Sequence, residues 1–132
     1  MPTYRDLVAF LNAAQPWLVA HPEDRKFRYA LKKMVKQAEK LWATYTEQSE
    51  DLDIEHCAVD KDGVIRKDER GQVAFTKEGL RKRNAARKAL FEADAGVVPF
   101  LATDVPAELT EAEREAFAGF VLPDVIEPED LA

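Results

Sequence analysis

The chain has 132 residues, of which 46% are hydrophobic and 33% charged, with a formal net charge of −6; this composition excludes a wholly disordered protein and suits one ordinary domain with a modest core. Its single cysteine, Cys57, excludes an internal disulfide and a zinc site built on paired cysteines. Because no segment approaches the roughly 20 apolar residues that span a bilayer, and the first residues lack a signal-peptide pattern, we expect a cytoplasmic protein.

The first residues predict a helix. Thr3 is a suitable N-cap, and Asp6 stands three residues later in an approximate capping box. Pro16 is expected to end or kink this helix, because proline lacks the backbone donor, before a second short turn near Trp17. The apolar residues that share one face are Leu7, Phe10, Leu11 and Ala14.

A long helix is predicted from Glu23 to near Ser49, because an apolar stripe recurs at spacings of three and four without proline or glycine. The apolar face is too wide for a two-stranded coiled coil and favours packing against several helices; a dimeric coiled coil is the alternative. The residues of the stripe are Phe27, Leu31, Met34, Ala38, Leu41 and Tyr45. We expect Leu31, Met34, Ala38 and Leu41 to lie in the core of one chain.

The other predicted helices are shorter than this one, so part of its apolar face is expected to stay uncovered. That strip carries Val35, Trp42 and Tyr45, which are the candidate interface. Pairing of two copies near Trp42 would cover it and gives a homodimer; the alternative is cover by the strands and the apolar residues 117–122 within the monomer. The expected partner is therefore a second copy or another protein.

Three short strands are predicted after the long helix, at His56–Val59, Val64–Lys67 and Gln72–Phe75. Aspartate-rich turns that end in glycine separate them, which predicts a small β-meander at one end of the domain. Residues 58–69 match part of a calcium-binding loop, but Ala58 occupies the first ligand position, so an ordinary turn is expected. His56 and Cys57, adjacent on a strand, point to opposite faces. We therefore expect no metal and no cofactor.

A third helix, capped by Thr76 and ending near Ala93, is strongly basic. Its cations predict phosphate contacts if they share a face, although the negative net charge and the lack of interleaved aromatic residues favour a solvated face. Nucleic-acid binding is therefore the alternative function. The candidate phosphate contacts are Lys77, Arg81, Lys82, Arg83, Arg87 and Lys88.

Farther along, Val97–Leu101 predicts a strand or an extended connector interrupted by Pro99. Thr110 and Glu113 form the clearest capping box in the sequence, which opens a short helix to Ala118. Apolar residues at 117–122 follow, and residues 123–132 predict an exposed acidic tail.

The order of these parts resembles a family of small phage and prophage proteins of unknown function. The resemblance rests on the long charged helix, the Asp-x-x-Gly turns, the segment from Phe75 to Leu80, and the run from Leu109 through Glu113 to Phe120. It covers about residues 23–123. It implies a phage setting and no activity or catalytic residue.

Together these patterns predict a mainly helical α+β domain over residues 1–122, with a long central helix packed by shorter ones and a β-meander at one end. No nucleotide-binding loop or catalytic motif is present in the sequence. We therefore expect no enzyme but an interaction or assembly module of phage or prophage origin that acts through helix faces.

Overall fold

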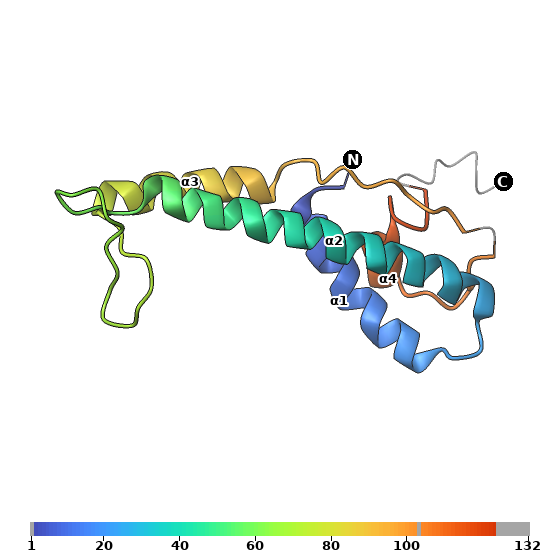
Figure 1. Ribbon diagram of the computed structural model, residues 1–132. Helices are drawn as coiled ribbons and strands as arrows, with labels where there is room; N and C mark the ends of the chain where they lie inside the picture. Colours follow the sequence, from blue (N-terminus) through green and yellow to red (C-terminus); the bar gives the residue numbers. More distant parts are fainter. Residues whose placement is uncertain (1, 103, 124–132) are drawn as a thin grey trace. The chain divides into compact units, whose positions relative to one another are not determined.

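A computed structural model describes residues 2–102 and 104–123, and in these residues the chain forms four helices (Figure 1). They are α1 (Tyr4–Ala20), α2 (Arg25–His56), α3 (Lys77–Phe91) and α4 (Glu111–Phe117). The mainly helical prediction is confirmed. Of the predicted acidic tail, residues 124–132 lie outside the described residues. No described helix is both long and apolar enough to cross a membrane.

The chain divides into two compact units. Unit 1 consists of Met1–Trp42 and Asp94–Ala132, and unit 2 of Ala43–Ala93. α2 contributes to both, because its residues 25–42 belong to unit 1 and its residues 43–56 to unit 2. The residues predicted as one domain, 1–122, are thus divided between two units, each of which is described by itself.

In unit 1, α1 begins with the predicted capping box. The Thr3 hydroxyl accepts from the Asp6 amide, and the Thr3 amide donates to the Asp6 carboxylate at 2.8 Å. Pro16 does not end the helix, which continues to Ala20. Since Pro16 and Asn12 are both exposed, water can solvate the carbonyl that proline leaves unpaired, while burial of Trp17 favours a further turn.

The core of unit 1 is an aromatic cluster that joins α1, α2 and α4. Phe10 stacks on Phe120 with ring centroids 4.3 Å apart, and Phe117 lies 5.8 Å from Phe10 and 6.0 Å from Phe27. Trp17 packs edge-on against Phe27 at 5.0 Å. The apolar residues at 117–122 close the core, since Phe117, Phe120, Val121 and Leu122 are all buried.

The apolar stripe of α2 is largely buried, as predicted. Leu31, Met34 and Ala38 are each no more than 1% exposed. Leu41, expected in the core, is only half-buried. It is the penultimate residue that α2 contributes to unit 1, so it lies at the edge of that core.

In unit 2, α2 runs seven residues beyond its predicted end at Ser49. The added residues are acidic and resemble a loop in sequence, but α3 packs against them. Asp53 pairs with Arg83 of α3 at 3.3 Å, and the rings of Tyr45 and Phe91 lie 5.7 Å apart. Contacts with α3 therefore extend α2 to His56.

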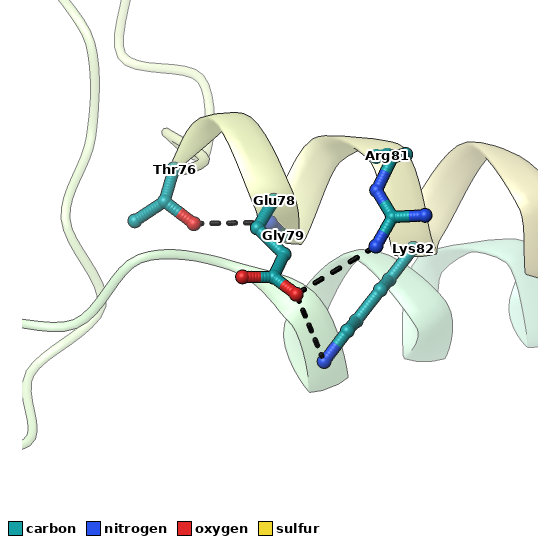
Figure 2. Close-up of polar contacts among 5 residues, drawn as sticks. All are labelled: Thr76, Glu78, Gly79, Arg81 and Lys82. Atoms are coloured by element: carbon teal, nitrogen blue, oxygen red, sulfur yellow. Dashed lines mark hydrogen bonds and ion pairs between the residues drawn. The ribbon is translucent and has the colours of Figure 1, made fainter.

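The start of α3 is also predicted correctly. The Thr76 hydroxyl accepts from the Gly79 amide at 3.0 Å, and Glu78 in the first turn reaches forward to Arg81 and Lys82 (Figure 2). A carboxylate near the N-terminus of a helix is favourable, because the unpaired amides there carry partial positive charge.

The predicted β-meander is wrong. Its segments form only isolated bridges among the described residues, Val59 with Ile65 and Lys67 with Val73, and His56 ends α2 instead of opening a strand. Both aspartate-rich turns do form. Asp60 accepts from the amides two and four residues later, and Asp68 repeats this pattern.

The hydrogen bonds among three peptide groups explain why no sheet forms here. The Ala58 amide donates to the Ala74 carbonyl at 2.8 Å, the Ala74 amide to the Arg66 carbonyl at 2.9 Å, and the Arg66 amide to the Ala58 carbonyl at 2.9 Å. In an open meander the outer segments pair only with the middle one. Because the first and third segments bond to each other here, the ring is closed and the segments do not extend into a flat ladder.

Candidate interaction surface

Residues 98–102 follow the N-terminal part of α2 within unit 1. The Gln37 amide holds one end, since its nitrogen donates to the Val98 carbonyl at 2.9 Å and its oxygen accepts from the Val98 amide at 2.8 Å. Farther along, the Phe100 amide donates to the Phe120 carbonyl and the Ala102 amide to the Val121 carbonyl. These bonds fix an extended segment, which is the connector that the sequence left undecided.

Between this segment and α2 lies an open hollow of about 440 Å³. Among its lining residues, the Tyr29 and Phe100 rings meet edge to face, with centroids 5.9 Å apart. We call it the Tyr29 hollow. Its lining residues are Arg25, Lys26, Tyr29, Ala30, Phe100, Leu101, Ala102 and Asp104.

The apolar side chains of the hollow are accessible. Tyr29 is 57% exposed, Phe100 43% and Leu101 55%. Single exposed apolar residues are ordinary, but a cluster of them over a hollow is typical of a binding site. Charged side chains frame the cluster: Lys33 lies 5.4 Å from the centre of the Tyr29 ring, and Lys26 pairs with Asp104 at 3.1 Å.

The six basic residues predicted on α3 do not all share one surface. Arg83 is half-buried, pairs with Asp53, and lies 4.9 Å from the Phe75 ring, so it holds unit 2 together. The other five are exposed. Lys77, Arg81 and Lys88 fall within about 40° of one another around the helix, whereas Lys82 and Arg87 lie roughly 80–100° from the nearest of these three, on either side.

Two of these cations border a second, shallower depression. Arg87 and Lys88 line it together with Arg83, Asn84 and the rings of Tyr45 and Phe91, over about 330 Å³. Arg81 and Lys82 instead reach Glu78, at 3.6 Å and 3.8 Å (Figure 2). The local positive charge of α3 is thus partly neutralised by its own carboxylate.

The residues predicted as a dimer interface are mostly covered. Val35 and Tyr45 are buried, and Trp42 is half-buried. Tyr45 packs on Phe91 in unit 2. The expected exposed strip is therefore wrong for Val35 and Tyr45, two of the three residues on which the predicted homodimer rests, and light scattering tests self-association itself.

No group of three or more His, Cys, Asp or Glu side chains within residues 2–102 and 104–123 is placed to hold a metal ion. In the loop that resembles a calcium site, Asp60 already accepts from the amides of Asp62 and Val64. Cys57 is half-buried with its sulfur 3.2 Å from the Ile54 carbonyl. The absence of calcium binding stays a prediction.

The sequence pattern does not point to Tyr29, Phe100 or Leu101 as site residues. Tyr29 stands off the apolar stripe of α2, and the other two belong to a segment too short to predict from periodicity. Pro99 was the one available signal, because it fixes an extended backbone and leaves its apolar neighbours outside any helix or strand.

Comparisons with known proteins add no family to this description. The chain matches no family model, no curated protein and no solved structure.

Proposed function

We propose that this chain is a non-enzymatic interaction module that binds a partner protein through the Tyr29 hollow on α2. The observation that carries the proposal is the exposed aromatic pair of Tyr29 and Phe100, set beside Leu101 over a hollow of about 440 Å³. Burying exposed aromatic and aliphatic surface is the main source of affinity in protein recognition, and a hollow accommodates an anchoring side chain.

The backbone segments that form the walls of the hollow are held in place, which favours binding of a partner. One wall is the helix α2, and the other is the segment fixed by the two hydrogen bonds of Gln37 and the bonds to Phe120 and Val121. A preorganised site loses little conformational entropy when it binds. The affinity of the hollow should therefore depend on its exposed side chains rather than on ordering of its backbone.

The partner in this proposal is another protein and the setting is the cytoplasm of a phage- or prophage-carrying cell. A second copy is the less favoured partner, because Val35 and Tyr45 are buried in the single chain. Light scattering of the full chain at about 100 µM is then expected to give the monomer mass of 14.9 kDa. Flanking phage genes would support the setting.

Selection from a library of displayed peptides tests the role of the hollow. The full chain is expected to enrich peptides with a bulky apolar residue, and Tyr29→Ala with Phe100→Ala should weaken their binding at least about tenfold, since truncating anchoring aromatic contacts commonly costs more than 1 kcal/mol. Leu80→Ala is the matched control. It removes an exposed apolar side chain that lies on α3 and is not part of the lining of the hollow, and should leave binding unchanged.

Failure to enrich any peptide, or peptides that bind the double variant as well as the native chain, would contradict the proposal. Circular dichroism of the double variant shows whether its helices are retained. Neither substituted side chain belongs to the buried core, so we expect the helical signal of the native chain.

The alternative function is nucleic-acid binding through the five exposed cations of α3. It predicts binding to unrelated duplexes that weakens with salt, because phosphate contacts release counterions. Arg87→Glu with Lys88→Glu is the relevant variant, since Arg83 is held by Asp53 and its replacement would disturb unit 2. Our proposal expects no duplex binding even at low salt.

A further inference from the structure

The first turns of α2 carry an unusual concentration of positive charge. Residues 25–36 include six cations and no carboxylate, namely Arg25, Lys26, Arg28, Lys32, Lys33 and Lys36. Like charges so closely spaced on one helix repel each other and destabilise it slightly. Acidic groups placed nearby would relieve this repulsion.

Three of these cations stand at the Tyr29 hollow. Arg25 and Lys26 line it, and the Lys33 ammonium lies 5.4 Å from the centre of the Tyr29 ring. Arg28 is directed elsewhere, because its guanidinium donates to the carbonyls of Leu18 and His21. The hollow is therefore surrounded by apolar side chains and by positively charged ones.

Among the described residues, acidic groups around the hollow are few and are gathered at one end. Asp104 is the single carboxylate of the described lining residues, and its contact with Lys26 joins side chains that are 60% and 82% exposed. Such an exposed pair contributes little, so an incoming carboxylate can replace Asp104 at Lys26. Glu23 and Asp24 line a neighbouring depression of about 350 Å³ together with Asp104. The part of the hollow near Lys33 therefore has fewer of these carboxylates beside it and is more positive.

From this arrangement we infer that the ligand of the Tyr29 hollow is an acidic segment of a partner protein that carries a bulky apolar anchor. The anchor packs against Tyr29, Phe100 and Leu101, and the carboxylates lie along α2 toward Lys33. The inference rests on the proposed function and adds the chemistry of the partner. Apolar burial supplies the affinity, and the cations Arg25, Lys26 and Lys33 supply specificity and speed of encounter.

A single-stranded nucleic acid is the competing occupant, since cations beside aromatic rings also bind stacked bases. The geometry favours the peptide. Lys33 lies over the Tyr29 ring, Phe100 meets the Tyr29 ring at 73°, and Leu101 is the other large apolar side chain of the lining. The rings thus do not form a parallel platform for successive bases.

Three matched peptides test the charge of the ligand. The acidic probe is a fluorescein-labelled peptide, Gly-Glu-Asp-Phe-Leu-Glu-Asp-Gly. In the neutral version Gln replaces each Glu and Asn each Asp, and in the basic version Lys occupies all four positions. At low salt we expect the full chain to bind the acidic peptide at least about tenfold more tightly than the neutral one. At about 0.5 M salt the Debye length falls to roughly 4 Å, so most of this difference in affinity should vanish.

Charge reversal in the protein gives the second arm. Lys33→Glu should remove the preference for the acidic peptide, because it places a carboxylate beside the Tyr29 ring. Lys82→Glu makes the same change in net charge on α3 and should leave the preference intact. A loss of preference in both variants would mean that net charge alone attracts the peptide, which overturns the inference.

The remaining outcomes separate the inference from the proposed function. Equal binding of all three peptides, lost in Tyr29→Ala with Phe100→Ala, overturns the acidic ligand but keeps the interaction module. Tighter binding of an oligodeoxythymidine than of the acidic peptide overturns both.

A last variant tests the acidic residues of the chain itself. In the full chain, Asp124 and Asp130 are replaced by Asn, and Glu127 and Glu129 by Gln. If this variant binds the acidic peptide more than tenfold better than the native chain, the segment of this chain is the occupant, and the assignment to a partner protein is overturned. Unchanged affinity supports a partner.

Discussion

Replacing Phe117 by alanine is expected to lower the free energy of unfolding of unit 1 by about 3–5 kcal/mol, the range for large-to-small changes at buried aromatic positions. Phe117 is fully buried, and its ring lies 5.8 Å from that of Phe10 and 6.0 Å from that of Phe27. One side chain of α4 thus contacts both α1 and α2. Truncation leaves a cavity where side chains of three helices meet.

Denaturant unfolding followed by tryptophan fluorescence measures this loss, because both tryptophans, Trp17 and Trp42, belong to unit 1. Phe100→Ala is the matched control. The same atoms are removed from a ring that is 43% exposed, so we expect a change of about 1 kcal/mol or less. Equal losses in the two variants would show that Phe117 is not at the centre of the core.

The parts of this fold that the sequence predicts are those governed by near neighbours. The capping boxes of Thr3 with Asp6 and of Thr110 with Glu113 involve residues three apart, and both form as the pattern indicates. The stripe of α2 is equally local, since its period reports one helix face. Burial of Leu31 and Met34 follows from that period alone.

What the sequence does not predict depends on distant partners. The segments around Ala58, Arg66 and Ala74 have the composition of strands, yet the bond between Ala58 and Ala74 closes them into a ring. The last turns of α2 carry acidic residues typical of a loop, and the pairing of Asp53 with Arg83 supports them as helix. Neither contact leaves a periodic signal.

The candidate site is hidden for the same reason. Tyr29 and Phe100 lie far apart in sequence, and the Gln37 side chain that holds Val98 beside α2 is an ordinary polar residue in the helix pattern. The basic residues of α3 were easier to find because charge is visible in composition. Composition does not show that Arg83 serves the packing of unit 2.

Gly79 of α3 is the position where helix propensity and the structure predict opposite signs. Alanine is favoured over glycine in a helix, by about 1 kcal/mol in the interior and by less in the first turn, where Gly79 lies, so propensity alone predicts that Gly79→Ala stabilises the protein. A Cβ at this position would lie 2.5 Å from the His56 carbonyl oxygen and 3.0 Å from the Thr76 hydroxyl that caps the helix. The carbonyl is backbone at the end of α2, so it cannot rotate away as a side chain would.

We therefore expect Gly79→Ala to lower the free energy of unfolding of unit 2 by about 1–3 kcal/mol, the usual cost of forcing extra volume into a close contact. Asn84→Ala on the same helix is the control: it also raises helix propensity, but Asn84 is exposed, so it should be neutral or slightly stabilising. Hydrogen exchange of the amides in α3 and in residues 43–56 of α2 locates the change in unit 2. If Gly79→Ala slows that exchange as much as Asn84→Ala does, α3 does not approach the end of α2 this closely. A close contact with the His56 carbonyl would then not be the reason for glycine at this position.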